Sequence, residues 1–98
     1  MTFEEVQALV TLHRAELASL GVRSLGVFGS VARGDATAAS DVDVLVEFDG
    51  RATFDRYMGL VLALQSWLGR RVDVVTARSL ERKPAFREQV LTEVRRVA

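Results

Sequence analysis

The segment from residue 41 to residue 48 limits the possible folds of this chain more than any other part of its sequence. Its large apolar side chains stand at every second position, as Val42, Val44, Val46 and Phe48. Because neighbouring side chains of a strand point to opposite faces, this alternation predicts a β-strand with one buried face. The buried face needs elements that cover it, and the opposite face carries Asp41 and Asp43.

The other elements follow from the spacing of the apolar residues and from the capping and turn signals. The predicted order is a helix at 3–20, a strand at 24–28, a loop at 29–40 that opens a short helix, the strand at 41–48, a helix at 53–68, a strand at 72–75, a helical turn from 79 and, after Pro84, an amphipathic helix at 85–97. Thr2 and Glu5 form a capping box, and Gly21 and Gly69 end the two long helices. The sequence therefore predicts an α/β (α+β) fold, a small mixed β-sheet of about three strands with helices packed against it.

Length and composition place these elements in one domain, residues 1–98. A chain of 98 residues has the size of a single small domain, and 49% hydrophobic with 27% charged residues is an ordinary globular composition. The chain has no cysteine and one histidine. This excludes a disulfide framework, a thiolate zinc site and a cysteine nucleophile.

The charges are unevenly divided along the chain, although the formal net charge is zero. Residues 1–50 hold three arginines against eight acidic residues, whereas residues 51–98 hold ten basic residues against five acidic ones. The acidic half indicates a cation site, the basic half is typical of solvated helix faces, and zero net charge argues against strong direct nucleic-acid binding. No apolar stretch approaches the ~20 residues that cross a bilayer, so we expect a cytoplasmic protein without membrane contact.

The segment Phe28-Gly29-Ser30 leaves a buried strand and enters a loop that can start a helix. Glycine lets a phosphate approach the backbone, serine adds a hydroxyl, and a helix start offers free amide groups. The alternative is an ordinary turn with a helix cap. Gly29 and Ser30 are therefore candidate phosphate-binding residues.

Three aspartates form the second candidate group. Asp41 and Asp43 lie two residues apart on one strand face, ~7 Å apart at the backbone, and their oxygen atoms favour Mg²⁺ or Mn²⁺. The alternative is an exposed edge strand with solubilising acids. Asp73 interrupts the apolar run at 72–75, where a buried carboxylate is costly unless it is paired, protonated or metal-bound. A salt bridge from Asp73 to Arg70 or Arg71 is the alternative for this residue.

The combination of these motifs resembles a known superfamily. Gly29 and Ser30, ten intervening residues, Asp41 and Asp43, and then the strand aspartate Asp73 are similar to the nucleotidyltransferases related to DNA polymerase beta. The sequences GSVARG at 29–34 and SDVDVLVEF at 40–48 most resemble the minimal nucleotidyltransferase (MNT) branch. The resemblance covers nearly the whole chain, and every motif position is filled.

This resemblance implies a nucleotidyltransferase fold and a role for each motif residue. Gly29 and Ser30 would hold the β- and γ-phosphates of the nucleotide, and Arg33 would add positive charge near the triphosphate. The catalytic aspartates Asp41, Asp43 and Asp73 would hold two Mg²⁺ ions, with Mn²⁺ as a possible substitute, and Asp73 would complete the metal at the acceptor hydroxyl or accept its proton.

The resemblance also implies a function and a partner. It implies an enzyme that moves AMP from ATP, and MNT proteins of this size resemble the antitoxin half of toxin–antitoxin pairs. The partner is then a neighbour-encoded, all-helical HEPN-type toxin with an acceptor tyrosine hydroxyl, held in a hetero-oligomer. One alternative is a non-catalytic module that neutralises its partner by occlusion. Another is a small-molecule nucleotidyltransferase like the aminoglycoside-modifying relatives, which carry a further helical region that this chain lacks.

Four other residues have a chemistry that could serve a site, and we interpret each of them as structural. Asp35 is expected to be a solvent-facing loop residue. His13 is expected to flank the first helix rather than bind a ligand. Tyr57 and Trp67 lie at helical spacing and are expected to pack against the core.

Overall fold

The computed structural model describes all residues from 1 to 98. Ten elements follow one another along the chain: α1 (Phe3–Leu12), α2 (Arg14–Ser19), β1 (Val22–Phe28), α3 (Gly29–Arg33), β2 (Val42–Phe48), α4 (Phe54–Leu68), β3 (Val72–Thr76), α5 (Ala77–Leu80), α6 (Pro84–Glu93) and β4 (Arg95–Arg96). The four strands form one sheet in the order β3-β2-β1-β4. The β2–β3 pair is parallel, whereas β1 pairs antiparallel with both β2 and β4. The predicted mixed α/β class is confirmed.

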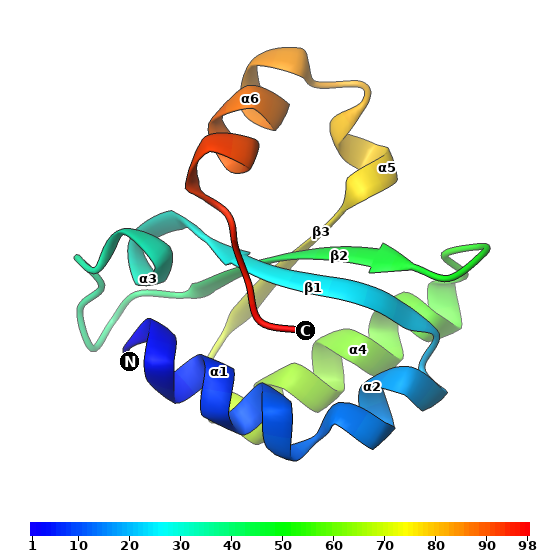
Figure 1. Ribbon diagram of the computed structural model, residues 1–98, viewed down its shortest axis with the longest axis horizontal. Coiled ribbons are helices and arrows are strands. Elements are labelled where there is room, and N and C mark those ends of the chain that lie inside the picture. The colour runs from blue at the N-terminus through cyan, green and yellow to red at the C-terminus, as the bar shows by residue number, and fades with distance from the viewer.

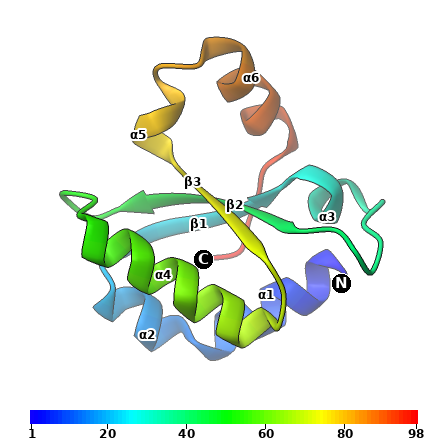
Figure 2. The same cartoon turned by 180° about the vertical axis from the view of Figure 1, so that it is seen from behind.

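The helices are divided between the two faces of the sheet. Figure 1 shows α1, α2 and α4 below the sheet and α5 and α6 above it, and the reverse view in Figure 2 agrees. The predicted alternation in β2 holds, because Val42, Val44, Val46 and Phe48 are all buried in the main core. Leu60 and Leu64 of α4 are fully buried in the same core. The face with α1, α2 and α4 is therefore the structural one.

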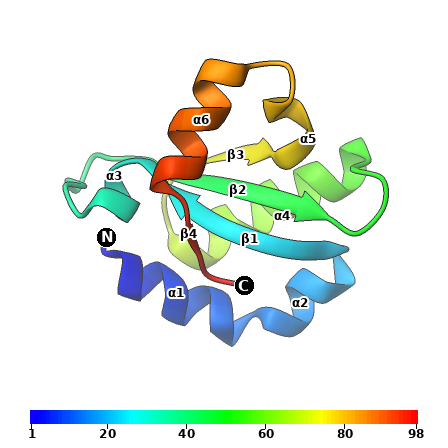
Figure 3. The same cartoon turned by 45° about the horizontal axis from the view of Figure 1, so that its top comes forward.

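The opposite face of the sheet carries a smaller apolar cluster and the acidic residues. Phe28, Leu80 and Val90 form this second cluster, with Leu45 and Val75 packed against it. Because side chains alternate along a strand, Asp43 and Asp73 lie on the same face as Leu45 and Val75. Figure 3 shows α6 standing over this face, close to the end of the sheet where α3 begins. The fold thus directs the acidic residues toward a space beneath α6.

Two of the predicted helices are wrong in extent, whereas β1 and α5 begin only two residues earlier than predicted. The helix predicted at 3–20 is divided at His13, whose backbone leaves the helical region at φ −108° and ψ 26°. The break lets the His13 ring stack on Trp67, with the ring centroids 4.2 Å apart. The side chains of His13 and Trp67 therefore contribute to packing.

None of the helices is both long enough and apolar enough to span a membrane.

The helix predicted at 85–97 ends at Glu93, and the chain continues as a fourth strand. The backbone becomes extended at Val94, and Arg95 and Arg96 pair with Val27 and Gly26 of β1. Gly26 permits this approach, because a Cβ atom there would lie 2.6 Å from Cγ2 of Val94. The free edge of β1 and the burial of Val97 stabilise the extended backbone more than a further helical turn would.

Candidate active site

Strand register brings two of the three predicted aspartates side by side. Asp43 of β2 pairs directly with Asp73 of the parallel strand β3. Neighbouring strands lie ~4.8 Å apart, so the two carboxyl groups leave the sheet next to each other. Asp41 lies two residues before Asp43, just before β2 begins, and the period of a strand places it on the same face. The register brings Asp43 and Asp73 together and does not include Asp41.

Gly29 places the start of α3 directly against Asp43. Its φ of +71° lies in the left-handed region that favours glycine. A Cβ atom at this position would overlap with Oδ2 of Asp43. The backbone of Gly29 therefore approaches the aspartate as closely as a residue without a side chain allows, and Ser30 follows at once.

One cavity contains most of the predicted site. It has a volume of about 420 Å³ and lies between the sheet and α6. Five predicted residues line it: Gly29, Ser30, Arg33, Asp43 and Asp73. Asp41 is half-exposed and does not line this cavity. The structure thus brings the phosphate-binding candidates together with two of the three aspartates.

The electrostatics of Asp43 reflect this crowding of acids. Partial burial raises the pKa of the Asp43 carboxyl above its usual range, and the neighbouring charges of Asp73 and Asp41 raise it further. Arg33 acts in the opposite direction and Glu93 in the same direction as the aspartates. The ionised form of Asp43 is therefore disfavoured unless positive charge enters the cavity.

The acidic residues fit a hard divalent cation by their chemistry. All of the candidate ligands are carboxylate oxygens, which is the donor type of Mg²⁺ and Mn²⁺ sites, and a cation would relieve the repulsion at Asp43. In the conformation described here, no group of three acidic or histidine side chains is arranged to hold one ion. Asp43 and Asp73 are the two aspartates that face the cavity together.

Arg33 is at the edge of the cavity, and its partners are acidic side chains. Its guanidinium forms an ion pair with Glu93 of α6 and a longer one of 3.4 Å with Asp35. The hydrogen bond to Glu93 and the one to Asp35 raise the pKa of Arg33. Asp35 is the exposed loop residue that was expected, and it also pairs with Arg33.

Glu93 was missed by sequence reasoning. Its side chain is only 14% exposed and lines the active-site cavity. The available signal was its spacing, because Glu93 falls on the same helical face as Phe86 and Val90. A carboxylate on an otherwise apolar stripe indicates a residue that faces a polar space.

Asp73 does not lie in the core, although it interrupts an apolar run of the sequence. Asp73 is exposed, because the sheet face above β3 is open at this point, while its neighbours Val72 and Val74 are buried on the other face. The alternative salt bridges to Arg70 and Arg71 do not form, since Asp73 takes part in none of the ion pairs of the chain.

Tyr57 packs between α4 and β3, and its hydroxyl donates a hydrogen bond of 2.9 Å to the carbonyl of Val74.

A mixed sheet that carries adjacent aspartates beside a Gly-Ser turn is the arrangement of a nucleotidyltransferase. The nucleotidyltransferase domain family matches residues 10–97 of the sequence. The chain belongs to this family, and its class of enzyme is that of the nucleotidyltransferases.

Similar proteins include small members of this family. The protein adenylyltransferase MntA of Thermococcus cleftensis is 42% identical over 95 residues, which is 96% of this chain and 94% of the relative. A solved structure assigned as a minimal nucleotidyltransferase has a TM-score of 0.81 at 42% identity, covering 97% of this chain and 95% of the other.

More distant solved structures are toxin–antitoxin complexes and share the fold. A toxin–antitoxin crystal structure with AMP-PNP has a TM-score of 0.74 at 22% identity, covering 94% of this chain and 72% of that chain. A complex of a tri-AMPylated Shewanella oneidensis HEPN toxin with an MNT antitoxin has a TM-score of 0.60 at 21% identity. It covers 90% of this chain and 71% of that chain.

Proposed function

We propose that this chain is the antitoxin of a toxin–antitoxin pair and transfers AMP from ATP to a hydroxyl group of a HEPN-type toxin. The observation that carries the proposal is the single cavity in which Gly29 and Ser30 lie beside the paired Asp43 and Asp73. The similarity to a protein adenylyltransferase supports AMP and a protein acceptor. The AMPylated toxin in the more distant complex supports a HEPN-type toxin as the acceptor of AMP.

The residues around the cavity have separate roles in this proposal. Ser30 and the backbone of Gly29 bind the β- and γ-phosphates of ATP, which places the α-phosphorus near Asp43. Asp43 and Asp73, with Asp41 two residues before Asp43, would hold two Mg²⁺ ions. When bound, such ions polarise the phosphate oxygens and lower the pKa of an attacking hydroxyl.

The transfer is a substitution at the α-phosphorus of ATP. The acceptor oxygen forms a bond to this phosphorus while the bond to the α–β bridging oxygen breaks, and pyrophosphate leaves with that electron pair. Asp73 accepts the proton of the acceptor hydroxyl, because it is exposed at the open side of the cavity where a second protein can approach. Asp43 is less exposed than Asp73, and it would hold a cation next to the α-phosphate.

Arg33 can bind the phosphates of ATP only after its ion pair with Glu93 opens. Its ion pair with Glu93 occupies the guanidinium at the edge of the cavity. A triphosphate carries more negative charge than one carboxylate and offers bidentate acceptors, so it competes for Arg33. Glu93 is then the group that holds Arg33 in place when no nucleotide is present.

The experiment that tests the proposal is transfer to the neighbour-encoded protein. The purified chain is incubated with ATP, Mg²⁺ and this protein, and the intact mass of the partner is measured. We expect a gain of one or more AMP units, which Asp43→Asn abolishes. Asp49→Asn is the matched control, because Asp49 is an exposed aspartate just beyond β2 and lines none of the cavities described here. An unmodified partner with the unchanged protein contradicts the proposal.

A further inference from the structure

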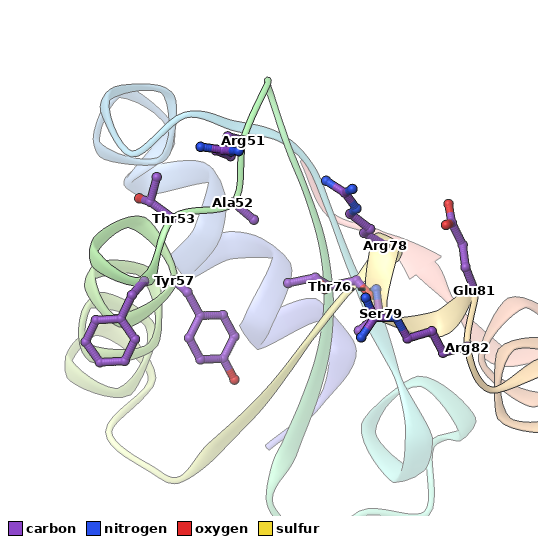
Figure 4. Close-up of a pocket in the computed structure, with 10 residues that line it drawn as sticks. Arg51, Ala52, Thr53, Tyr57, Thr76, Arg78, Ser79, Glu81 and Arg82 are labelled. Carbon is purple, nitrogen blue, oxygen red and sulfur yellow. Dashed lines mark hydrogen bonds between the residues drawn. The ribbon is translucent and has the colours of Figure 1, made fainter.

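A cavity larger than the active-site cavity lies outside the active site. It has a volume of about 630 Å³ and is formed by the loop before α4, the first turn of α4 and the segment around α5. Three arginines line it, Arg51, Arg78 and Arg82, and Glu81 is the one acidic residue among the lining residues (Figure 4). None of these arginines takes part in an ion pair within the chain. Their positive charges are therefore available to a ligand.

Aromatic side chains lie on the opposite wall of this cavity. Phe54 is 76% exposed and presents its ring at this cavity. Tyr57 is held in position by its hydrogen bond to the carbonyl of Val74. Figure 4 shows the Tyr57 ring on the α4 side and the side chains of Arg78 and Arg82 on the α5 side. The cavity thus combines free guanidinium groups with an apolar surface.

A third cavity shares lining residues with both the basic cavity and the active-site cavity, along the edge strand β3. It has a volume of about 300 Å³ and shares Tyr57, Thr76 and Ser79 with the basic cavity. It shares Val75 and Phe86 with the active-site cavity. β3 is the last strand of the sheet, so no further strand closes its outer side. We call this surface, from Asp73 to Arg51, the β3 trough.

The two ends of the β3 trough have opposite charge. The active-site end carries Asp43, Asp73 and Glu93 against Arg33. The far end carries Arg51, Arg78 and Arg82, with Lys83 in the third cavity, against Glu81. A ligand that fills the trough must place an uncharged group, such as a hydroxyl, at the active-site end. It must place negative charge at the far end.

We infer that the β3 trough binds the acceptor protein through an acidic, extended segment that lies next to the acceptor hydroxyl in its sequence. This inference rests on the proposed function, because it names the surface that delivers the acceptor. The strand rises ~10 Å from Asp73 to Thr76, and Arg78 lies in the first turn of α5 just beyond it. An extended segment of about three to five residues therefore spans the distance from Asp73 to Arg78. The acidic residues of the acceptor are therefore expected at that spacing from its hydroxyl.

A protein segment fits the trough better than a nucleic acid does. Phosphates spaced evenly along a strand would meet the carboxylates at the active-site end, and like charges repel there. The outward carbonyl of Val74 already accepts the Tyr57 hydrogen bond. The segment is therefore recognised by its acidic and apolar side chains rather than by extension of the sheet.

Synthetic peptides of about ten residues test the inference directly. Each contains one tyrosine and three glutamates about four residues away, placed on the amino side in one peptide and on the carboxyl side in another. Matched peptides carry glutamine in place of glutamate. We expect one glutamate peptide to bind at least about tenfold more tightly than its glutamine counterpart in a fluorescence anisotropy titration.

Variants of the chain then locate the binding surface. Arg78→Ala/Arg82→Ala is expected to remove the preference for the glutamate peptide. Arg14→Ala/Arg87→Ala is the matched control, because both arginines are exposed, lie outside the described cavities and form no ion pair. Equal binding of the glutamate and glutamine peptides overturns the inference, and so does an equal loss in both double variants. Displacement of the glutamate peptide by equimolar single-stranded RNA also overturns it, since the trough is then a nucleic-acid site.

The same variants separate this inference from the proposed function. If the unchanged chain does not add AMP to its neighbour-encoded partner, the proposed function fails. If it does so, and Arg78→Ala/Arg82→Ala modifies the partner with an unaltered KM for the partner, the docking surface is wrong while the proposed function stands. We expect the KM for the partner to rise about tenfold or more in this variant, and the control to match the unchanged chain.

Discussion

Replacement of Gly29 by alanine measures how closely the α3 backbone approaches Asp43. Two effects oppose the new methyl group: the positive φ of +71° and the overlap with Oδ2 of Asp43. A left-handed backbone costs a residue with a Cβ atom about 1–2 kcal/mol, and overpacking costs about 1–3 kcal/mol more. Gly29→Ala should therefore lower the free energy of unfolding by about 2–5 kcal/mol, a large share of the ~5–15 kcal/mol of a small domain.

Urea unfolding of a double-mutant cycle separates the two effects. In an Asp43→Ala background the overlap disappears, so Gly29→Ala should cost only about 1–2 kcal/mol there. Gly50→Ala is the matched control, because Gly50 has a φ of +80° and no atom within 4 Å of an added Cβ. It should cost the same about 1–2 kcal/mol in both backgrounds. An equal cost of Gly29→Ala with and without the Asp43 side chain would refute the close approach described here.

Three further predictions concern the charge, the ligands and the packing of the site. Asp43→Asn should raise the free energy of unfolding at neutral pH in the absence of metal, because the raised pKa of Asp43 means that its ionised form destabilises the fold. The gain in stability should vanish as the pH falls below the ordinary pKa of an aspartate, because Asp43 is then protonated in both the folded and the unfolded protein. A gain that persists in acid would show that the charge of Asp43 is not its cause. Mg²⁺ with a non-hydrolysable ATP analogue should raise the melting temperature, and Asp41→Ala/Asp43→Ala should remove the part of the shift that depends on metal. An equal shift in the double variant would argue against these ligands. Tyr57→Phe should cost about 0.5–1.5 kcal/mol in urea unfolding, because it leaves the Val74 carbonyl without its hydrogen bond. A cost near zero would show that water replaces the tyrosine hydroxyl.

The elements that depend on local pattern could be predicted from the sequence. The alternation at 41–48 indicates both the strand and its buried face, and Thr2, Gly21 and Gly69 mark helix ends as expected. β4 could not be predicted, because Arg95 and Arg96 are exposed and pair only where β1 offers a free edge. The break at His13 likewise accompanies a ring contact with Trp67, more than fifty residues away, which no local pattern indicates.

The candidate site shows the same division between local and distant information. The spacing of Gly29, Ser30, Asp41 and Asp43 is local, and strand geometry is enough to place Asp43 on the open face. The exposure of Asp73 could not be read from an apolar run, because such a run does not tell which face another element covers. Glu93 reaches the cavity only through the position of α6 over the sheet, which is a tertiary feature.

The central claim is that this chain neutralises its partner by a covalent transfer, and the most direct measurement is the mass and activity of the partner after separation. The neighbour-encoded protein is incubated with ATP, Mg²⁺ and the unchanged chain, Ser30→Ala or Asp43→Asn, and is then purified away from each. The unchanged chain should leave a partner that carries AMP and stays inactive. Both variants should bind the partner yet leave it unmodified and active once separated. A partner that carries no AMP and recovers its activity equally in all three cases would contradict the claim and favour neutralisation by occlusion.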